Sequence, residues 1–431
     1  MIIWSQCNDK DKAAILSRPQ QTSNPEITRR TAQILADVEQ KGDQALRTWT
    51  QELDGQTVAE FRLTLELRDA LAAQLDDASK AALQKAFDAI YRFHSAQRPD
   101  RWSLSTQPGV VCEWRFAPIE QVGLYVPGGS ASLPSTVLML AIPAIIAGCK
   151  RIAMVTPTNQ SAQPISPAIA YATQLCGVEE IYRIGGAQAI AALAFGTESI
   201  RRVDKIFGPG NAYVTEAKRQ VAARGICAID MLAGPSELMI IADDQAEAQV
   251  IAADLLSQAE HGPDSQVMLV STSAELIKAT RTAIANQLTT LPRRSIAERA
   301  LTHMRVILVD SIEQACDICQ RYAPEHLIIN TNSPRQWLDR ITNAGSVFLG
   351  PWSPETAGDY ASGTNHCLPT YGTGRTQSAL SVEDFGRRFA VQELTQAGLK
   401  QLAPVLLQIA KIEQLAAHAN AVQIRLPEGL S

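Results

Sequence analysis

Four of the six histidines, namely His261, His326, His366 and His418, lie beside other polar or site-like residues. The stretch LLSQAEHGPDSQ, residues 255–266, carries Gln258 and His261 three positions apart, just before a Gly-Pro pair that ends a helix. Both side chains therefore project from one face of the last helical turn. They could bind a metal through an amide oxygen and an imidazole nitrogen. The spacing alone favours a helix C-terminus at which the imidazole caps carbonyls, since glutamine is an uncommon ligand.

A second candidate is the sequence PEHLII, in which Glu325 and His326 follow Pro324 at the start of a predicted strand. Adjacent residues of a regular strand point to opposite faces, so the two could serve one site only from a bend before the strand. There, a histidine and a carboxylate could act as bases on a substrate and on water. An ordinary polar strand start explains the residues equally well.

A third candidate is the stretch 351–377, which is rich in Gly, Ser, Thr and Pro and carries Asp359 and His366. A structureless loop of that length is usually functional or disordered, and we expect a functional one. Asp359 could alternatively make an Asx-turn.

Near the C-terminus, Glu413 and His418 are five positions apart, about 140° around a regular helix. Considered alone, that spacing favours a solvated helix face over a shared small ligand.

Three glycine turns each follow a predicted strand and open a helix, namely YVPGGS, RIGGAQ and IFGPGN. That geometry presents backbone N–H groups to phosphates, although any such sheet needs tight turns. None has the G-x-G-x-x-G spacing of the usual dinucleotide fingerprint.

Among the eight cysteines, only Cys316 and Cys319 form a C-x-x-C pair, and they fall in mid-helix. Free, mostly buried thiols are therefore expected.

The elements that would position these side chains alternate along the chain. Residues from about 25 to 94 are helical in pattern. After about residue 110, short apolar strands alternate with helices in two successive series. This alternation predicts an α/β protein with two incomplete, Rossmann-like, doubly wound parallel-sheet domains. Residues 380–431 return to a helical pattern, including VEDFGRRFAVQEL, and predict a small helical C-terminal tail domain.

The composition fits a globular protein, because 46% of the 431 residues are hydrophobic, 19% are charged and the net charge is −5. The absence of a basic block argues against nucleic-acid binding. The longest apolar run, residues 136–149, is too short to cross a bilayer. Charged residues near the N-terminus do not fit a signal peptide. We therefore expect a cytoplasmic protein that binds neither membranes nor nucleic acids.

Taken together, the sequence resembles histidinol dehydrogenase over nearly its whole length. The segments that carry the resemblance are VGLYVPGGSA, GGAQAIAALAFGT, KIFGPGNAYVTEAKRQV, AGPSE, DLLSQAEHGPDSQ, PEHLI, AGSVFLG, SPETAGDYASGTNHCLPT and AAHANAV. The resemblance implies a zinc-dependent, four-electron oxidation of L-histidinol through L-histidinal to L-histidine with two NAD⁺, the last step of histidine biosynthesis. It also implies a homodimer whose tail swaps across, so that the two subunits share each active site.

The resemblance further implies roles for individual residues. His326 would be the base in the hydride-transfer steps, and Glu325 would activate water on the aldehyde. One zinc ion per subunit would orient the substrate through its imidazole and amine nitrogens. The implied zinc ligands are Gln258, His261, Asp359 and His418. The implied substrate contacts are Ser236, Gln258, His261, His326, Asp359, His366, Glu413 and His418, of which Glu413 and His418 come from the partner subunit. The implied NAD⁺ contacts are Tyr125, Gln188 and Asn211.

Four regions are expected on this basis. They are an N-terminal segment packing with the tail (1–22), a first α/β domain with the metal and catalytic residues (23–124 and 237–378), a second, NAD-binding α/β domain (125–236) and the swapped tail (379–431). Two alternatives stay open: a zinc alcohol dehydrogenase that stops at the aldehyde of a related amino alcohol, and a non-catalytic NAD- or metal-binding protein. Glu325 argues against the first, and the complete set of bases and ligands against the second.

Overall fold

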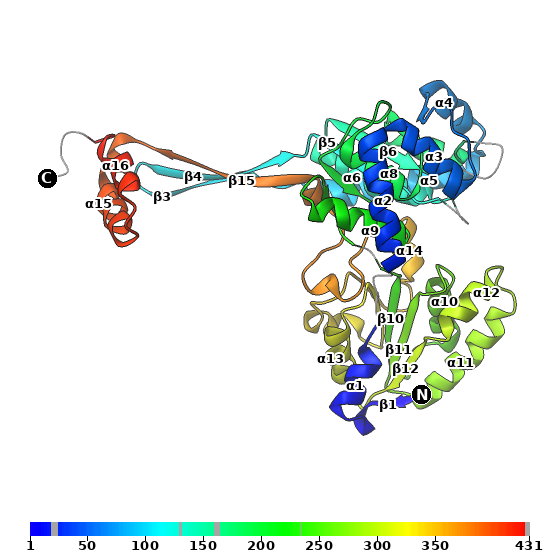
Figure 1. Ribbon diagram of the computed structural model, residues 1–431. Helices are drawn as coiled ribbons and strands as arrows, with labels where there is room; N and C mark the ends of the chain where they lie inside the picture. Colours follow the sequence, from blue (N-terminus) through cyan, green and yellow to red (C-terminus); the bar gives the residue numbers. More distant parts are fainter. Residues whose placement is uncertain (19–24, 129–131, 159–163, 233, 427–431) are drawn as a thin grey trace. The chain divides into compact units, whose positions relative to one another are not determined.

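The computed structural model describes residues 1–18, 25–128, 132–158, 164–232 and 234–426. The chain falls into two compact units (Figure 1), the first made of Met1–Gln97 and Ile119–Phe385, the second of Arg98–Pro118 and Gly386–Ser431. Two six-stranded sheets form the framework of the first unit. We name them the β5 sheet and the β10 sheet after a central strand of each. Within these described ranges, no helix has both the length and the apolar character needed to cross a membrane.

The β5 sheet has the strand order β2-β7-β6-β5-β8-β9 and is parallel except at its edge strand β2. Its strands are β2 (Arg62–Leu63), β5 (Gln121–Tyr125), β6 (Arg151–Thr156), β7 (Glu180–Arg183), β8 (Lys205–Phe207) and β9 (Ala228–Ile229). One face is covered by α4 (Leu65–Ala73), α5 (Asp77–Ser95), α6 (Pro134–Ala147) and α7 (Pro167–Leu175). The other face is covered by α2 (Pro25–Lys41), α3 (Asp43–Asp54), α8 (Gly186–Phe195) and α9 (Ala212–Ala223).

The β10 sheet has the order β1-β12-β11-β10-β13-β14, and all of its pairings are parallel. Its strands are β1 (Ile2–Ile3), β10 (Glu237–Ala242), β11 (Gln266–Ser271), β12 (Arg305–Leu308), β13 (His326–Asn330) and β14 (Ser346–Leu349). Helices α10 (Ala248–Ala259), α11 (Ala274–Leu288) and α12 (Arg294–Leu301) cover one face. Helix α13 (Ile312–Tyr322) and the N-terminal segment with α1 (Asp9–Leu16) cover the other. Both faces are buried, which explains the near-continuous apolar runs of β10 and β13.

Among the described residues, four 3₁₀ segments and one helix complete the first unit. The stretch 351–377, expected to lack secondary structure, contains α14 (Glu355–Tyr360) and the 3₁₀ turn η3 (Thr373–Arg375). Two further 3₁₀ segments are η2 (Pro334–Arg340) and η4 (Val382–Phe385), and another, η1 (Trp4–Gln6), follows β1. The expected α/β class, with two largely parallel sheets and C-terminal helices, is confirmed.

The second unit combines a three-stranded antiparallel sheet with two helices. Its strand order is β15-β4-β3, and its elements are β3 (Trp102–Gln107), β4 (Val110–Pro118), β15 (Gly386–Leu394), α15 (Gln396–Ile412) and α16 (Ala416–Gln423). The prediction of a helix over VEDFGRRFAVQEL is wrong, because residues 386–394 form a strand that pairs with β4 along the whole length of β4. That pairing joins residues that are far apart in the sequence, so the local sequence pattern could not predict it.

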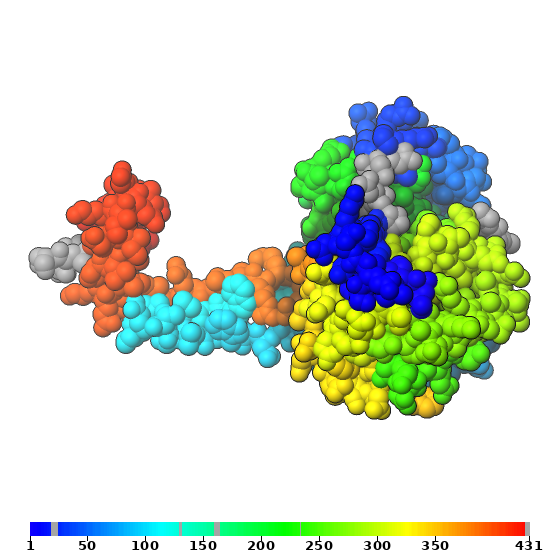
Figure 2. Space-filling model, turned by 90° about the horizontal axis from the view of Figure 1, so that it is seen from below, coloured from blue at the N-terminus to red at the C-terminus, as the bar shows by residue number. Residues whose placement is uncertain are grey.

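The expected region boundaries also differ from the packing. Helices α2 to α5 pack on the β5 sheet rather than with residues 237–378, because their apolar faces complete the two cores of that sheet. The N-terminal segment packs within the first unit. It adds β1 to the edge of the β10 sheet and buries Trp4 in that core, and Figure 2 shows it in dark blue on the surface of the first unit. The second unit in turn includes residues 98–118.

Candidate active site and metal centre

Two adjoining cavities lie between the carboxyl ends of strands in the β5 sheet and the amino ends of strands in the β10 sheet. The larger cleft has a volume of about 940 Å³, and the smaller cavity of about 180 Å³. Their common lining residues are Pro209, Gly234, Ser236 and His261. A ligand in the small cavity would therefore touch the same wall as a ligand in the cleft.

Most of the predicted catalytic, metal and substrate residues line the smaller cavity, although they come from five separate segments. They are Ser236, Gln258, His261, Glu325, His326, Asp359 and His366. Sequence spacing alone left several of these residues with equally good ordinary explanations. Their convergence on one cavity distinguishes them from isolated polar residues.

The end of α10 supplies Gln258 and His261. The helix closes with the His261 N–H donating to the Gln258 carbonyl at 3.2 Å. The Gln258 side chain is fully buried, and neither its amide oxygen nor its amide nitrogen has a hydrogen-bond partner among the described residues. Leaving a buried polar group unpaired costs about 1–3 kcal/mol. The Gln258 amide oxygen is therefore available to bind a ligand next to His261.

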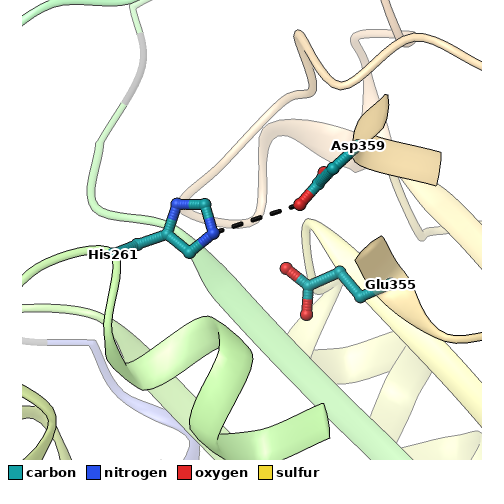
Figure 3. A group of neighbouring side chains, drawn as sticks. All are labelled: His261, Glu355 and Asp359. Atoms are coloured by element: carbon teal, nitrogen blue, oxygen red, sulfur yellow. Dashed lines mark ion pairs between the residues drawn. The ribbon is translucent and has the colours of Figure 1, made fainter. Parts of the chain in front are cut away.

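Helix α14 brings Glu355 and Asp359 to the same point, one helical turn apart. Each of Glu355, Asp359 and His261 offers a ligand atom, and these three atoms lie within 4.8 Å of one another (Figure 3). The His261 Nε2 and an Asp359 carboxylate oxygen are 4.0 Å apart. Glu355 was not among the predicted residues. Its signal was the Glu-x-x-x-Asp spacing, which has meaning only if the segment is a helix.

The electrostatics of this cluster favour a bound cation. Burial raises the pKa of Asp359 to about 6. Burial and the nearby carboxylates of Asp359, Glu325 and Asp254 raise the pKa of Glu355 well above its usual range. Burial lowers the pKa of His261. Several carboxylates held together without a cation resist ionisation, whereas a divalent ion would stabilise their charged forms. The donor set of nitrogen and oxygen atoms therefore fits a zinc ion.

Glu325 and His326 both face the smaller cavity from the start of β13. The His326 Nδ1–H donates to the Glu237 carbonyl at 3.0 Å, while Glu325 Oε2 accepts from the Glu237 N–H at 2.8 Å. Two residues before Glu325, Ala323 has φ 52° and makes the bend that the two adjacent side chains need to serve one site. The bend allows two adjacent side chains to serve one site, which a regular strand would prevent.

These two side chains have strongly perturbed pKa values. Burial, together with the charges of His261 and His366, lowers the pKa of His326 to about 3, and the hydrogen bond to the Glu237 carbonyl opposes this shift. Burial raises the pKa of Glu325 well above its usual range, and the Glu237 N–H opposes that rise. The His326 Nε2 has no hydrogen-bond partner among the described residues and lies 3.8 Å from Asp359 Oδ1. Because its pKa is lowered, the His326 imidazole is neutral near pH 7, and the free lone pair on Nε2 can accept a proton.

His366 and Ser236 complete the cavity wall. The His366 Nδ1–H donates to the Asp359 carbonyl at 2.9 Å, and its Nε2 lies 3.4 Å from the Thr136 hydroxyl. Burial lowers the pKa of His366 to about 4. The Ser236 carbonyl accepts from the Gln266 N–H at 2.9 Å, which fixes the chain where β10 begins.

The three predicted NAD⁺ contacts lie at the carboxyl edge of the β5 sheet, but only Asn211 lines the large cleft. Asn211 caps α9 by accepting from the Tyr213 and Val214 N–H groups at 3.0 and 3.1 Å. Tyr125 and Gln188 are buried and line neither cavity. The Tyr125 hydroxyl accepts from the Gly186 N–H at 3.1 Å, so Tyr125 holds the glycine turn that opens α8.

Glu413 and His418 belong to the second unit. Glu413 is the C-cap of α15, and His418 lies on α16, which follows after Gln414 adopts φ 57°. Both side chains are exposed. The short turn between the helices replaces the single regular helix on which the predicted separation of about 140° was based.

Comparisons with known proteins point to one family. A sequence model described as histidinol dehydrogenase matches residues 16–426. Histidinol dehydrogenase from Vibrio cholerae is 51% identical over 427 residues, covering 99% of this chain and 98% of that protein. Histidinol dehydrogenase from Yersinia pestis is 51% identical over 99% of this chain and 95% of its own length. The crystal structure of histidinol dehydrogenase from Elizabethkingia anophelis superposes with a TM-score of 0.94 at 44% identity, covering 98% of this chain and 96% of that one.

Proposed function

Because the chain belongs to the histidinol dehydrogenase family, we propose that it oxidises L-histidinol through L-histidinal to L-histidine and reduces two NAD⁺. The observation that carries the residue roles is the pairing of Glu325 and His326 in one cavity, each hydrogen-bonded to the backbone of Glu237. Two bases of different type suit a reaction that needs one proton acceptor for an alcohol and one for water.

His326 is the proposed base for hydride transfer. Because its Nδ1–H donates to the Glu237 carbonyl, the free lone pair lies on Nε2 of a residue that lines the small cavity. In the first oxidation, Nε2 takes the hydroxyl proton while the carbon-bound hydrogen leaves as hydride for NAD⁺. In the second, it takes a proton from the hydrated aldehyde as the second hydride leaves.

Glu325 is the proposed base for hydration of the aldehyde. Its carboxylate takes a proton from water as the water oxygen adds to the aldehyde carbon. The aldehyde oxygen takes the proton that His326 accepted in the first oxidation, which gives the hydrate and returns His326 to its neutral form. Retaining the aldehyde between the two oxidations protects a reactive intermediate from side reactions. Burial raises the pKa of the Glu325 carboxyl group, which makes its carboxylate a stronger base than an exposed one.

The proposed metal site holds one zinc ion per subunit, bound by Gln258, His261, Asp359 and His418 of the partner subunit. Support comes from the unpaired Gln258 amide and the convergence of His261 and Asp359. When bound, zinc orients the substrate by its imidazole and amine nitrogens. Ser236, His366 and Glu413 of the partner subunit are the proposed further substrate contacts.

The proposed NAD⁺ site is the large cleft at the carboxyl edge of the β5 sheet. Asn211 is the proposed direct contact at a helix N-terminus, where backbone N–H groups favour phosphate. Tyr125 and Gln188 are proposed contacts as well. The buried Gln188 side-chain oxygen, for which the described residues offer no partner, would need a ligand or a small side-chain movement to be satisfied.

The proposed assembly is a homodimer in which the second unit completes the partner's site. Support comes from an apolar stripe on α15, where Val405, Ile409 and Ile412 are 53%, 47% and 70% exposed. Their spacing of four and three residues places them on one helix face. An exposed face of this kind is typical of a surface that another chain covers.

The test is the NADH yield from limiting L-histidinol with zinc-loaded protein and excess NAD⁺. Two NADH per histidinol, with histidine as product, is the expected result. One NADH would mean that the aldehyde leaves, and would favour the single-step alcohol dehydrogenase. No NADH at all would contradict the proposed function.

A further inference from the structure

The peptide groups of Glu237 lie between the two proposed bases. The register of the β10 sheet pairs Leu238 with His326, which brings Glu237 beside Glu325. The Glu237 N–H donates to Glu325 Oε2 at 2.8 Å, and the Glu237 carbonyl accepts from His326 Nδ1–H at 3.0 Å. A small movement of Glu237 would therefore displace both bases at once.

The side chain of Glu237 is anchored by an arginine from the N-terminal segment. Glu237 is fully buried, and both of its carboxylate oxygens bond to Arg18, with Nη2 and Oε2 at 2.7 Å and Nε bonded to Oε1. The Tyr371 N–H also donates to Oε1 at 3.3 Å. Two charge-assisted hydrogen bonds from one guanidinium fix both the position and the orientation of the Glu237 carboxylate. A single ammonium group would not fix the orientation.

The same guanidinium holds the turn that leads into the bases. Arg18 Nη2 donates to the carbonyls of Tyr322 and Ala323 at 2.9 and 3.1 Å, and the guanidinium carbon lies 3.9 Å from the centre of the Tyr322 ring. Ala323 adopts a left-handed conformation two residues before Glu325, at a cost of about 1–2 kcal/mol. Arg18 thus bonds to both the strand start and the turn that together define the geometry of the pair.

We infer that Arg18 and Glu237 are positioning residues for both oxidations: Arg18 fixes Glu237, and the Glu237 backbone aims the Glu325 carboxylate and fixes the His326 tautomer. This inference rests on the proposed function of Glu325 and His326. Neither Arg18 nor Glu237 lines the small cavity, so their effect is transmitted through the bases.

The β5 sheet contains a matched ion pair for comparison. Arg151 and Glu180 lie at the amino ends of β6 and β7, with Nη2 and Oε2 at 2.7 Å and side chains 9% and 15% exposed. Arg151 also donates to the carbonyls of Arg201 and Arg202 at 3.1 and 3.0 Å. It therefore reproduces the paired guanidinium–carboxylate bonds, the burial and the two carbonyl bonds of Arg18, but it lines neither cavity.

The test compares Arg18→Gln, Arg18→Lys and Arg151→Gln as zinc-loaded, full-length proteins. Oxidation of L-histidinol and of separately supplied L-histidinal is measured for each. We expect Arg18→Gln to lower kcat of both oxidations by about 10²-fold, the loss that a displacement of about 1 Å can cause. KM for histidinol should change far less than kcat, and Arg18→Lys should recover part of the loss. Arg151→Gln should lower the melting temperature by a similar amount while leaving kcat near the wild-type value.

Nuclear magnetic resonance of ¹⁵N-histidine-labelled protein gives a readout independent of turnover. In wild type, His326 should be present as the Nδ1–H tautomer, and Arg18→Gln should produce a mixture. His326→Asn identifies the signal. If Arg18→Gln proves too unstable, the double variant Arg18→Gln/Glu237→Gln removes both buried charges and restores folding, yet should keep a low kcat.

Three results would overturn the inference: wild-type kcat in Arg18→Gln, wild-type kcat in the double variant, or an equal kcat loss in Arg151→Gln. Each presupposes that the wild-type protein reduces NAD⁺ with histidinol. If it does not, the proposed function fails instead, so the two failures are distinguishable.

Discussion

The two sheets of the first unit contribute opposite edges to the site. The β5 sheet contributes the carboxyl ends of its strands, where β8 leads through Gly208 and Pro209 to the cap of α9. The β10 sheet contributes the amino ends of its strands, where α10 and α13 also end. Parallel α/β sheets usually bind ligands at carboxyl ends, so only the β5 sheet follows the common rule.

The difference has an electrostatic consequence. Helix N-termini carry partial positive charge and free N–H groups, which favour an anionic dinucleotide at the β5 sheet. Helix C-termini carry partial negative charge, which favours a cation at the β10 sheet. The end of α10 and the carboxylates of α14 add further negative potential there. Because the two edges face each other across the adjoining cavities, the proposed hydride acceptor and the proposed metal-held substrate would lie close together.

The largest expected effect is at the amino edge. His326→Asn should lower kcat of both oxidations by about 10³-fold, because the variant loses the base. Asparagine retains an N–H donor that can reach the Glu237 carbonyl, so folding should be preserved, as a melting curve would check. Steady-state kinetics with histidinol and with histidinal measure the effect. Activity within tenfold of wild type would remove His326 from the mechanism.

A smaller and more selective effect is expected at the neighbouring residue. Glu325→Gln should lower the rate of histidinal oxidation by about 10²-fold while sparing histidinol oxidation, because only the second step needs activated water. Single-turnover measurements of NADH formation separate the two steps. Equal losses in both steps would show that Glu325 does not have the separate role proposed for it.

Metal removal should expose the charge difference between the edges. The carboxyl groups of Asp254 and Asp359 both have pKa values raised by burial to about 6, from 3.8. A raised folded-state pKa gives stability that is present below the unfolded value and is lost as pH rises through about 6. Each group then corresponds to about 3 kcal/mol as an upper estimate. These two groups therefore lower the stability of metal-free protein between pH 4.5 and pH 8, whereas the lowered pKa values of His326 and His366 act in the opposite direction. The contribution of Asp254 is isolated by comparing wild type with Asp254→Asn, and zinc should stabilise the protein most at pH 8.

Thermal unfolding with chelator and with zinc, at both pH values, measures this linkage. Asp254→Asn is the control, because it removes one buried carboxyl group and leaves the proposed ligands intact. It should retain part of the pH dependence in metal-free protein. Identical changes in stability between pH 4.5 and pH 8 for metal-free wild type and metal-free Asp254→Asn would contradict the expectation.

The smallest effect is expected at the carboxyl edge. Asn211→Ala should weaken NAD⁺ binding by roughly tenfold or less and cost about 1 kcal/mol of stability, because it removes a helix cap at the cleft. Ser273→Ala is the matched control, since Ser273 caps α11 at the carboxyl edge of the β10 sheet, away from both cavities. Calorimetric titration with NAD⁺ should detect weakening only in Asn211→Ala. Equal affinities in the two variants would count against a dinucleotide site at this edge.

Much of the framework could be predicted from the sequence, because it depends on local pattern. The alternation of short apolar strands with helices predicts two largely parallel sheets, and the structure contains them. The Gly-Pro pair after His261 marks the end of α10, and the structure ends that helix at Ala259. The mid-helix position of Cys316 and Cys319 is likewise confirmed. In each case the information lies within one turn of helix or one strand.

Other features required the tertiary structure. Residues 386–394 form a strand because β4, far away in sequence, offers a partner along its whole length. Glu355 could not be identified because its segment, rich in loop-forming residues, becomes helical within the packed site. Arg18 lies more than two hundred residues from Glu237 in sequence, so nothing near either residue signals their ion pair. Residue types and spacing determined which chemical groups the chain carries, whereas long-range packing decided which of them meet.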